Sequence, residues 1–127
     1  MYSIKEVERM YGLPSSTLRY YEKEGILPKI HRDSGGRRKY TEEQLEWLQL
    51  IIALRDTGMS MAEIRRYVEL VMQGDETLEI RRSVLLFHKE AVEKKMEQTL
   101  KHLEKINRKM AIYDVMVRGK NPKDFLI

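Results

Sequence analysis

The sequence predicts a mainly α-helical protein in which a small helical module with a β-hairpin precedes a long C-terminal helix. Two short helical segments near the start are separated by a glycine-containing turn, the arrangement of a helix-turn-helix. A basic stretch with paired glycines follows and has the pattern of a β-hairpin. Further along, about forty residues free of proline and glycine keep a helical pattern.

The first helix is expected to begin after Ser3 and to end at Gly12. Ser3 and Glu6 form a capping-box pattern, in which each side chain bonds the backbone N–H of the other residue. Leu13 and Pro14 then turn the chain toward the next helix. The expected inward stripe of this first helix comprises Ile4, Val7, Met10 and Tyr11.

The second helix is expected between Pro14 and a left-handed exit at Gly25, with Ser15 or Ser16 as its N-terminal cap. Leu18 and Tyr21 share the inward face. Small hydroxyl groups in the first turn allow a helix to approach a phosphate-lined groove, and an arginine can bind a guanine edge or a phosphate. Taken alone, an amphipathic helix with a solvated basic face is the simpler interpretation. The outward face carries Ser15, Ser16, Arg19, Tyr20 and Lys23.

Residues 28–40 predict a hairpin wing with a turn at residues 33–36, Asp-Ser-Gly-Gly. Arg37, Arg38 and Lys39 on this wing are suited to phosphate contacts or to a narrow groove. The hydroxyl group of Tyr40 is expected to donate to a phosphate. The alternative interpretation of this segment is a solvated, flexible basic loop.

Two further helices are expected to link this module to the long helix. Thr41 with Gln44 starts a largely apolar helix that ends at Gly58, and Ser60 starts another that ends at Gly74. Arg65 and Arg66 fall on the outer side of the latter helix, where phosphate contact and solvation are equally consistent with the sequence. The expected inward residues are Leu45, Trp47, Leu48, Ile51, Ile52 and Leu54 in the one, and Ile64, Tyr67, Val68, Val71 and Met72 in the other.

The long helical pattern from about Asp75 to Arg118 contains apolar positions spaced alternately by four and three residues. Four short helices cannot cover such a stripe, so a second copy of the chain is expected to pack against it. The resulting division is a module at 1–74, a dimerisation helix at 75–118 and a tail at 119–127. Phe125, Leu126 and Ile127 in the tail are expected to pack on an apolar surface. The predicted dimer seam comprises Val92, Met96, Thr99, Leu103, Ile106, Met110, Tyr113 and Val117.

The excess positive charge lies in the first third of the chain, whose net charge is +4. Residues 1–41 contain nine Lys or Arg and five Asp or Glu, whereas residues 42–127 contain 15 of each sign. A basic module joined to a neutral body is the electrostatic pattern expected of a nucleic-acid-binding protein. A basic chain with evenly spread charge would carry much less information about its partner.

Composition also excludes several kinds of site. The chain has no cysteine, which rules out disulfides, thiolate metal sites and thiol redox sensing. Its start has no signal-peptide pattern. The longest apolar run, residues 47–54, is far shorter than the ~20 residues that a bilayer span needs. We therefore expect a cytoplasmic protein with no membrane partner.

The order of these parts resembles the MerR family of bacterial transcriptional regulators. The resemblance is carried by TLRYYEKEGIL, SGGRRKYTEEQL, LRDTGMSMAEIRRYVEL and the terminal helix, and it covers about residues 2–118. It implies a winged helix-turn-helix DNA-binding domain and a homodimer joined by an antiparallel coiled coil. It also implies binding to a two-fold symmetric promoter site, whose distortion lets RNA polymerase engage both promoter elements. It maps the DNA contacts onto Ser15, Ser16, Thr17, Arg19 and Tyr20, and onto Arg37, Arg38, Lys39 and Tyr40 of the wing.

The sequence departs from the family in the positions used for sensing. The branch that it most resembles carries a sensor cysteine within a segment like IIALRDTGM, and Ala53 occupies that position. A C-terminal ligand domain like that of the drug-responsive members is also not expected. The effector is therefore unknown. A small-molecule pocket involving Trp47, Ala53 and Tyr67 is a weaker expectation.

The sequence contains little that favours a metal site or an enzyme over a regulator. His88 and His102 lie about 21 Å apart along one helix and cannot share an ion, so neither a metal nor a cofactor is expected. The chain has no nucleophile–base pair and no glycine-rich phosphate loop of the kinds found in enzymes. The main alternative is a dimeric helical adaptor that binds protein and has only non-specific affinity for DNA.

Overall fold

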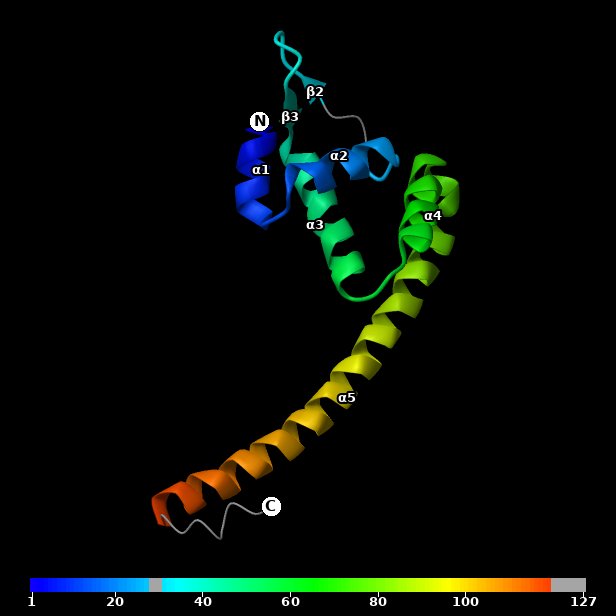
Figure 1. The fold of residues 1–127 in the computed structure, drawn as a ribbon. Helices are drawn as coiled ribbons and strands as arrows, with labels where there is room; N and C mark the ends of the chain where they lie inside the picture. Colours follow the sequence, from blue (N-terminus) through cyan, green and yellow to red (C-terminus); the bar gives the residue numbers. More distant parts are fainter. Residues whose placement is uncertain (28–30, 120–127) are drawn as a thin grey trace. The chain divides into compact units, whose positions relative to one another are not determined.

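The computed structural model describes residues 1–27 and 31–119 (Figure 1). Its contacts divide the chain into two compact units, residues 1–85 and residues 86–127. Helices dominate both, as the sequence predicts. The elements in order are β1 (Tyr2–Ser3), α1 (Ile4–Tyr11), α2 (Ser15–Lys23), β2 (His31–Arg32), β3 (Arg38–Tyr40), α3 (Glu42–Asp56), α4 (Met61–Met72), the 3₁₀ turn η1 (Asp75–Thr77) and α5 (Leu78–Gly119).

Helix α1 begins with the capping box that the sequence predicts. The Ser3 hydroxyl accepts a hydrogen bond from the Glu6 N–H, and the Glu6 carboxylate accepts one from the Ser3 N–H, both at 3.2 Å. The helix ends at Gly12, whose φ of 64° lies in the left-handed region that favours glycine.

Helix α2 begins differently from the prediction. Its N-cap is Pro14, and no side chain caps the helix. Ser15 is already the first helical residue, so neither Ser15 nor Ser16 is in the extended conformation that a capping side chain requires. The Pro14 carbonyl instead accepts the N–H of Thr17 at 3.0 Å. The predicted serine cap is therefore wrong, and both hydroxyl groups are free of that role.

The C-terminal end of α2 turns the chain back into the core. Gly25 has a φ of 72°, and the Ile26 N–H donates to the Tyr21 carbonyl at 2.9 Å, the bond typical of a Schellman motif. Ile26 and Leu27 are consequently buried directly behind the helix.

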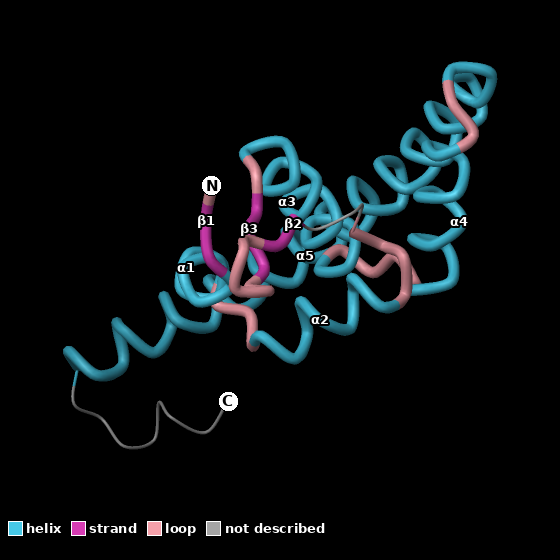
Figure 2. Tube along the Cα trace, turned by 90° about the horizontal axis from the view of Figure 1, so that it is seen from above, coloured by secondary structure: helices cyan, strands magenta, loops and turns pink. Residues whose placement is uncertain are grey.

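Three short strands form an antiparallel sheet in the order β1-β3-β2 (Figure 2). The predicted hairpin is confirmed over residues 31–40, and its first three residues, 28–30, lie outside the described residues. Its turn is closed by hydrogen bonds from the Asp33 N–H to the Arg37 carbonyl and from the Gly36 N–H to the Asp33 carbonyl, both 2.9 Å. Strand β1 was not predicted. It pairs Tyr2 with Tyr40 and Ser3 with Lys39, and so ties the chain's start to the wing.

One apolar core fills the first unit. Helix α3 starts with the predicted capping box of Thr41 and Gln44 and contributes four buried apolar side chains to this core, as does α4. Met10 and Met72 were predicted to face inward but are 50% and 62% exposed. Both lie near the end of their helix, about 90° from the centre of its buried face. The buried apolar residues are Val7, Leu13, Leu18, Tyr21, Ile26, Leu27, Tyr40, Leu45, Leu48, Ile51, Leu54, Met59, Ile64, Tyr67, Val68 and Leu70.

Helix α5 is preceded by η1 rather than beginning at Asp75. Thr77 is buried there, and its hydroxyl donates to the Leu70 carbonyl at 2.5 Å. Val84 and Leu85 of α5 pack against the core of the first unit, but no residue of α5 is fully buried. No helix within residues 1–27 and 31–119 is long and apolar enough to cross a membrane. The predicted contacts of Phe125, Leu126 and Ile127 lie outside the described residues.

Candidate nucleic-acid interface

A basic groove of about 470 Å³ lies on the first unit, between the start of α1, helix α2 and the wing. Its side chains include five cations and no carboxylate. Four of the predicted DNA-contact residues come together here from two segments of the chain. The groove is lined by Ser3, Ile4, Lys5, Arg19, Gly36, Arg37, Arg38 and Lys39.

Lys5 belongs to this groove although it was not among the predicted DNA contacts. Strand β1 pairs with β3 at Ser3 and Lys39, which brings the start of α1 alongside the wing. The excess of basic residues in the first 41 was a signal for Lys5, since it is one of the nine cations there. Its place in the groove depends on a strand of two residues that sequence patterns do not reveal.

The predicted residues of α2 occupy its outward side. Arg19 and Lys23 are exposed, and Tyr20 is 43% exposed. Ser16 is exposed as well, whereas Ser15 and Thr17 are half-buried. Arg19 is the α2 residue that lines the groove, and the others extend the polar surface beyond it.

Two of the wing arginines are bound to α2 by one carboxylate. The Arg38 Nε lies 2.5 Å from Glu22 Oε2, and an Arg32 nitrogen lies 3.7 Å from Glu22 Oε1. Arg32 also donates to the Gly36 carbonyl at 2.9 Å, within the turn of the wing. Arg38 is therefore half-buried in an ion pair, while Arg37 at the turn is exposed.

Tyr40 belongs to the core rather than to the interface. Its side chain is fully buried, and burial raises the pKa of its hydroxyl group. The prediction that this hydroxyl donates to a phosphate is therefore wrong. The physical reason is that the Tyr40 ring belongs to the apolar core of the first unit, so its hydroxyl group is not presented at the surface.

Asp33 shapes the turn that carries Arg37. Its carboxylate accepts the N–H of Gly35 at 2.9 Å and the N–H of Arg37 at 3.0 Å. The bond from the Arg37 N–H, together with that from Gly35, holds the pKa of Asp33 below its ordinary value. The ionised aspartate thus holds the backbone of the turn at Gly35 and Arg37.

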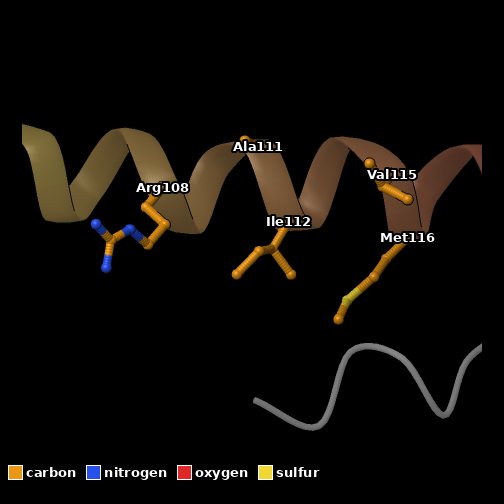
Figure 3. A pocket seen from close by; sticks show the side chains of 5 residues that line it. All are labelled: Arg108, Ala111, Ile112, Val115 and Met116. Atoms are coloured by element: carbon orange, nitrogen blue, oxygen red, sulfur yellow. The ribbon is translucent and has the colours of Figure 1, made fainter.

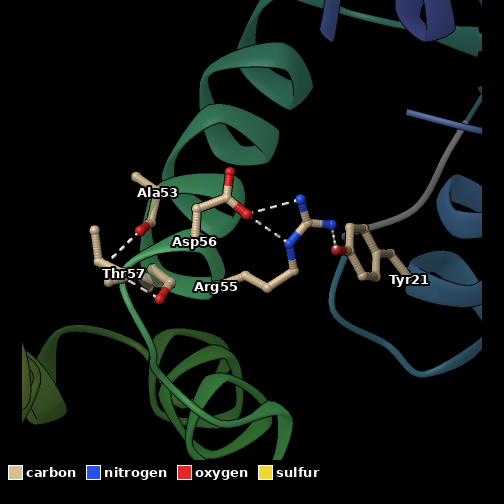
Figure 4. Close-up of polar contacts among 6 residues, drawn as sticks. Tyr21, Ala53, Arg55, Asp56 and Thr57 are labelled. Carbon is tan, nitrogen blue, oxygen red and sulfur yellow. Dashed lines mark hydrogen bonds and ion pairs between the residues drawn. The ribbon is translucent and has the colours of Figure 1, made fainter. Parts of the chain in front are cut away.

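Further polar contacts tie α2 to the helices behind it. Arg55 on α3 donates to the Tyr21 hydroxyl at 2.5 Å and pairs with Asp56 at 2.9 Å (Figure 4). Arg65 on α4 lies 3.0 Å from a Glu24 carboxylate oxygen at the end of α2. The sequence was equally consistent with phosphate contact and with solvation of Arg65. In the structure Arg65 forms an ion pair with Glu24.

The structure brings together two of the three residues suggested for an effector pocket. The rings of Trp47 and Tyr67 are stacked with centroids 6.2 Å apart, and the Trp47 Nε1 donates to the Ile26 carbonyl at 2.7 Å. Ala53 is exposed and lies about 120° around α3 from Trp47. A pocket shared by all three remains a prediction.

The second unit exposes the predicted seam. Met96, Ile106 and Val117 are 58–60% exposed. Leu103 and Met110 are also exposed, whereas Val92 and Tyr113 are half-buried. A separate, largely apolar hollow lies off the seam, and Figure 3 shows Arg108, Ile112 and Met116 on the same side of α5 there. Ala111 and Val115 complete its lining.

Comparison with known proteins gives consistent results over most of the chain. The family model described as MerR HTH family regulatory protein matches residues 2–70, and the model described as MerR, DNA binding matches residues 45–109. An HTH-type transcriptional regulator of Haemophilus influenzae is 35% identical over 112 residues, which cover 88% of this chain and 83% of that protein.

Two solved structures show the same fold over nearly the whole chain. One is HiNmlR, a MerR family regulator lacking the sensor domain, in complex with promoter DNA. It has a TM-score of 0.82 and 33% identity, and the match covers 92% of this chain and 93% of that one. The other is a MerR family protein from Listeria monocytogenes, with a TM-score of 0.81, 30% identity, and coverage of 98% and 96%.

Proposed function

Because the chain belongs to the MerR family of helix-turn-helix transcriptional regulators, we propose that it binds a two-fold symmetric promoter site as a homodimer and distorts that DNA. Its relatives place it in a family of DNA-binding regulators rather than a family of enzymes. The observation that carries the proposal is the basic groove between α1, α2 and the wing.

Helix α2 is the element suited to the major groove, which admits one α-helix. Arg19 is exposed on its outward side and can bind a guanine edge through two parallel hydrogen bonds. Ser16 is exposed near the start of the helix, where a small hydroxyl group allows close approach to the DNA backbone. These residues are proposed to select the sequence.

The rest of the groove is suited to phosphates. Arg37 and Lys39 on the wing and Lys5 on α1 present cations from separate elements to one surface. Neutralising phosphates releases counterions, so these contacts contribute affinity that depends on salt but not on sequence. They would hold α2 in a single orientation while it reads the bases.

Dimerisation is supported by the exposed seam of α5. Its large apolar side chains alternate at spacings of four and three residues, the repeat that buries a stripe between two helices. A symmetric pair of chains would present two identical basic grooves, and a two-fold symmetric DNA site follows from that symmetry.

A linked pair of grooves can also strain the DNA between them. Smooth bending of a 20–30 bp site costs on the order of 1–6 kcal/mol, which additional phosphate contacts must offset. Two modules held at a set separation by a helical pair can supply those contacts at both ends of the site. RNA polymerase would then respond to the altered promoter geometry rather than to a direct contact with this protein.

Selection of bound DNA from random sequence tests this proposal. A homodimeric regulator is expected to enrich a palindrome with two half-sites at a fixed separation. Retention of non-specific DNA without any palindrome would contradict the proposal and favour the adaptor alternative. Sedimentation at the same protein concentration would report whether the chain is a dimer.

A further inference from the structure

Glu22 is an acidic residue at the contact between α2 and the wing, beside the basic groove. It lies on α2 three residues after Arg19, and its carboxylate contacts Arg38 of β3 and Arg32 of β2. A negative charge close to bound DNA weakens binding by simple electrostatics. If Glu22 favours DNA binding, its contribution to the binding free energy must exceed this repulsion.

The contact between Glu22 and Arg38 is shielded from solvent. Their side chains are 23% and 22% exposed, and the nitrogen and oxygen atoms lie 2.5 Å apart. Charge-assisted hydrogen bonds of this kind are stronger than neutral ones, and partial burial reduces their screening by salt. The pair is therefore expected to stabilise the contact between α2 and β3 more than an ordinary surface ion pair would.

The pair joins the two elements that must contact DNA together. Arg38 stands in the central strand of the three-stranded sheet, and Arg32 pairs with it across the hairpin. Both guanidinium groups converge on one carboxylate of α2. The direction of the wing is thereby coupled to the orientation of the helix that carries Arg19.

We propose that Glu22 is a positioning residue for DNA binding, which holds the wing in register with α2 through Arg38. This inference rests on the proposed function of the basic groove. Arg38 acts in it mainly as the partner of Glu22. Arg37 and Lys39 form no ion pair within residues 1–27 and 31–119. In this proposal they contact phosphates, and the position of the wing relative to α2 brings them to those phosphates.

Glu24 provides a matched control on the same segment. It is also half-buried and paired with an arginine, Arg65, at 3.0 Å. That arginine belongs to α4, behind α2, and not to the wing. Removing either glutamate changes the net charge by the same amount and breaks one arginine contact, so a difference between them is not explained by net charge.

The experiment measures binding of the full chain to the selected palindrome and to an unrelated duplex of equal length. The variants are Glu22→Ala, Glu22→Gln, Glu24→Ala and Glu24→Gln. Glu22→Ala is expected to weaken binding to the palindrome about tenfold, a factor that corresponds to about 1.4 kcal/mol. Binding to the unrelated duplex should stay equal or become tighter, because one negative charge is lost.

Glu22→Gln should recover part of the loss, since its amide oxygen still accepts a hydrogen bond from Arg38 while the charge change is the same. The Glu24 variants should bind the palindrome at least as tightly as the parent. Equal or tighter binding of the palindrome by Glu22→Ala would overturn the inference. So would an equal loss on both duplexes, or an equal loss in Glu24→Ala.

A double-mutant cycle covers the case in which Glu22→Ala does not fold. If Arg38 acts through Glu22, then Glu22→Gln combined with Arg38→Gln should bind the palindrome no more weakly than Arg38→Gln alone. Additive losses would overturn the inference. A parent protein that selects no palindrome would instead refute the proposed function, and the inference with it.

Discussion

Individual basic residues of the interface differ in whether they already have a partner inside the protein. Arg38 is paired with Glu22, and Arg65 is paired with Glu24. Arg19 and Arg37 form no ion pair within residues 1–27 and 31–119 and are exposed. The unpaired arginines are therefore the better candidates for direct contact with DNA, a distinction that composition alone does not give.

Arg19 and Arg37 are expected to respond differently to substitution. Arg19→Ala should lower the preference for the selected palindrome over unrelated DNA, by about 1–3 kcal/mol if its guanidinium reads one guanine. Arg37→Ala should weaken binding to both duplexes similarly and reduce the slope of log affinity against log salt by about 1. Titrations at several salt concentrations measure both effects. An equal loss on both duplexes for Arg19→Ala would contradict its role in reading sequence.

The turn of the wing is expected to be sensitive to acid through Asp33. Hydrogen bonds from the backbone N–H groups of Arg37 and Gly35 lower its pKa in the folded state. The ionised form therefore stabilises the turn above the unfolded-state pKa, and this contribution is lost as the pH falls through the folded-state pKa. An NMR titration should find the carboxyl resonance and both amide resonances shifting together, at a pH below the ordinary aspartate range. A midpoint at or above that range would contradict the assignment.

At the scale of secondary-structure elements, the predictable features were those that depend on neighbours in sequence. The capping boxes at Ser3 and Thr41 and the hairpin turn after Asp33 each need only a few adjacent residues. Strand β1 escaped prediction because it has two residues and pairs with a strand far along the chain. It pairs with β3 at Tyr40, whose side chain is buried in the core instead of exposed in the interface.

The start of α2 was predicted incorrectly from the serines that follow Pro14, although the proline itself is the N-cap.

Long-range polar contacts could not be predicted from the sequence. The bond between Arg55 and Tyr21 joins residues 34 positions apart and has no local signature. Helix periodicity predicted the inward face of α2 at Leu18 and Tyr21, but not the side chains that hold this helix against α3.

Arg55 is expected to stabilise the attachment of α2 to α3. Arg55→Met removes a donor to the Tyr21 hydroxyl and the ion pair with Asp56, and should lower the free energy of unfolding by about 1–2 kcal/mol. Urea unfolding at a fixed protein concentration measures this change. Arg66→Met, at an exposed position of α4, is the control and should have a much smaller effect. Equal midpoints for the two variants would contradict the role given to Arg55.

At the scale of the whole molecule, sequence predicted the arrangement of charge and the periodicity of α5 more directly than any contact. The basic excess lies within residues 1–41, and the basic groove is formed entirely from those residues. The seam repeats over more than three heptads, so its exposure on a single chain followed from local spacing. The same spacing gave no indication of the separate hollow around Ile112, because its residues fall between the seam positions.

The proposed dimer is tested by Ile106→Asp together with Met110→Asp. Two carboxylates in an apolar seam would have to be buried without partners, so the double variant is expected to sediment as a monomer. Ala91→Asp with Gln98→Asp adds the same charge to α5 at exposed positions off the seam and should remain a dimer. Loss of the link between two half-site contacts should weaken binding to the palindrome about 10²–10⁴-fold.

The same double variant separates the basic groove from the seam. Each monomer keeps its own groove, so its binding to unrelated DNA should fall far less than its binding to the palindrome. Sedimentation and DNA titration on one preparation make this comparison. A seam variant that stays dimeric would refute the proposed interface. A monomer that still binds the palindrome as tightly as the parent would instead show that one groove suffices, and that the exposed apolar stripe of α5 has another partner.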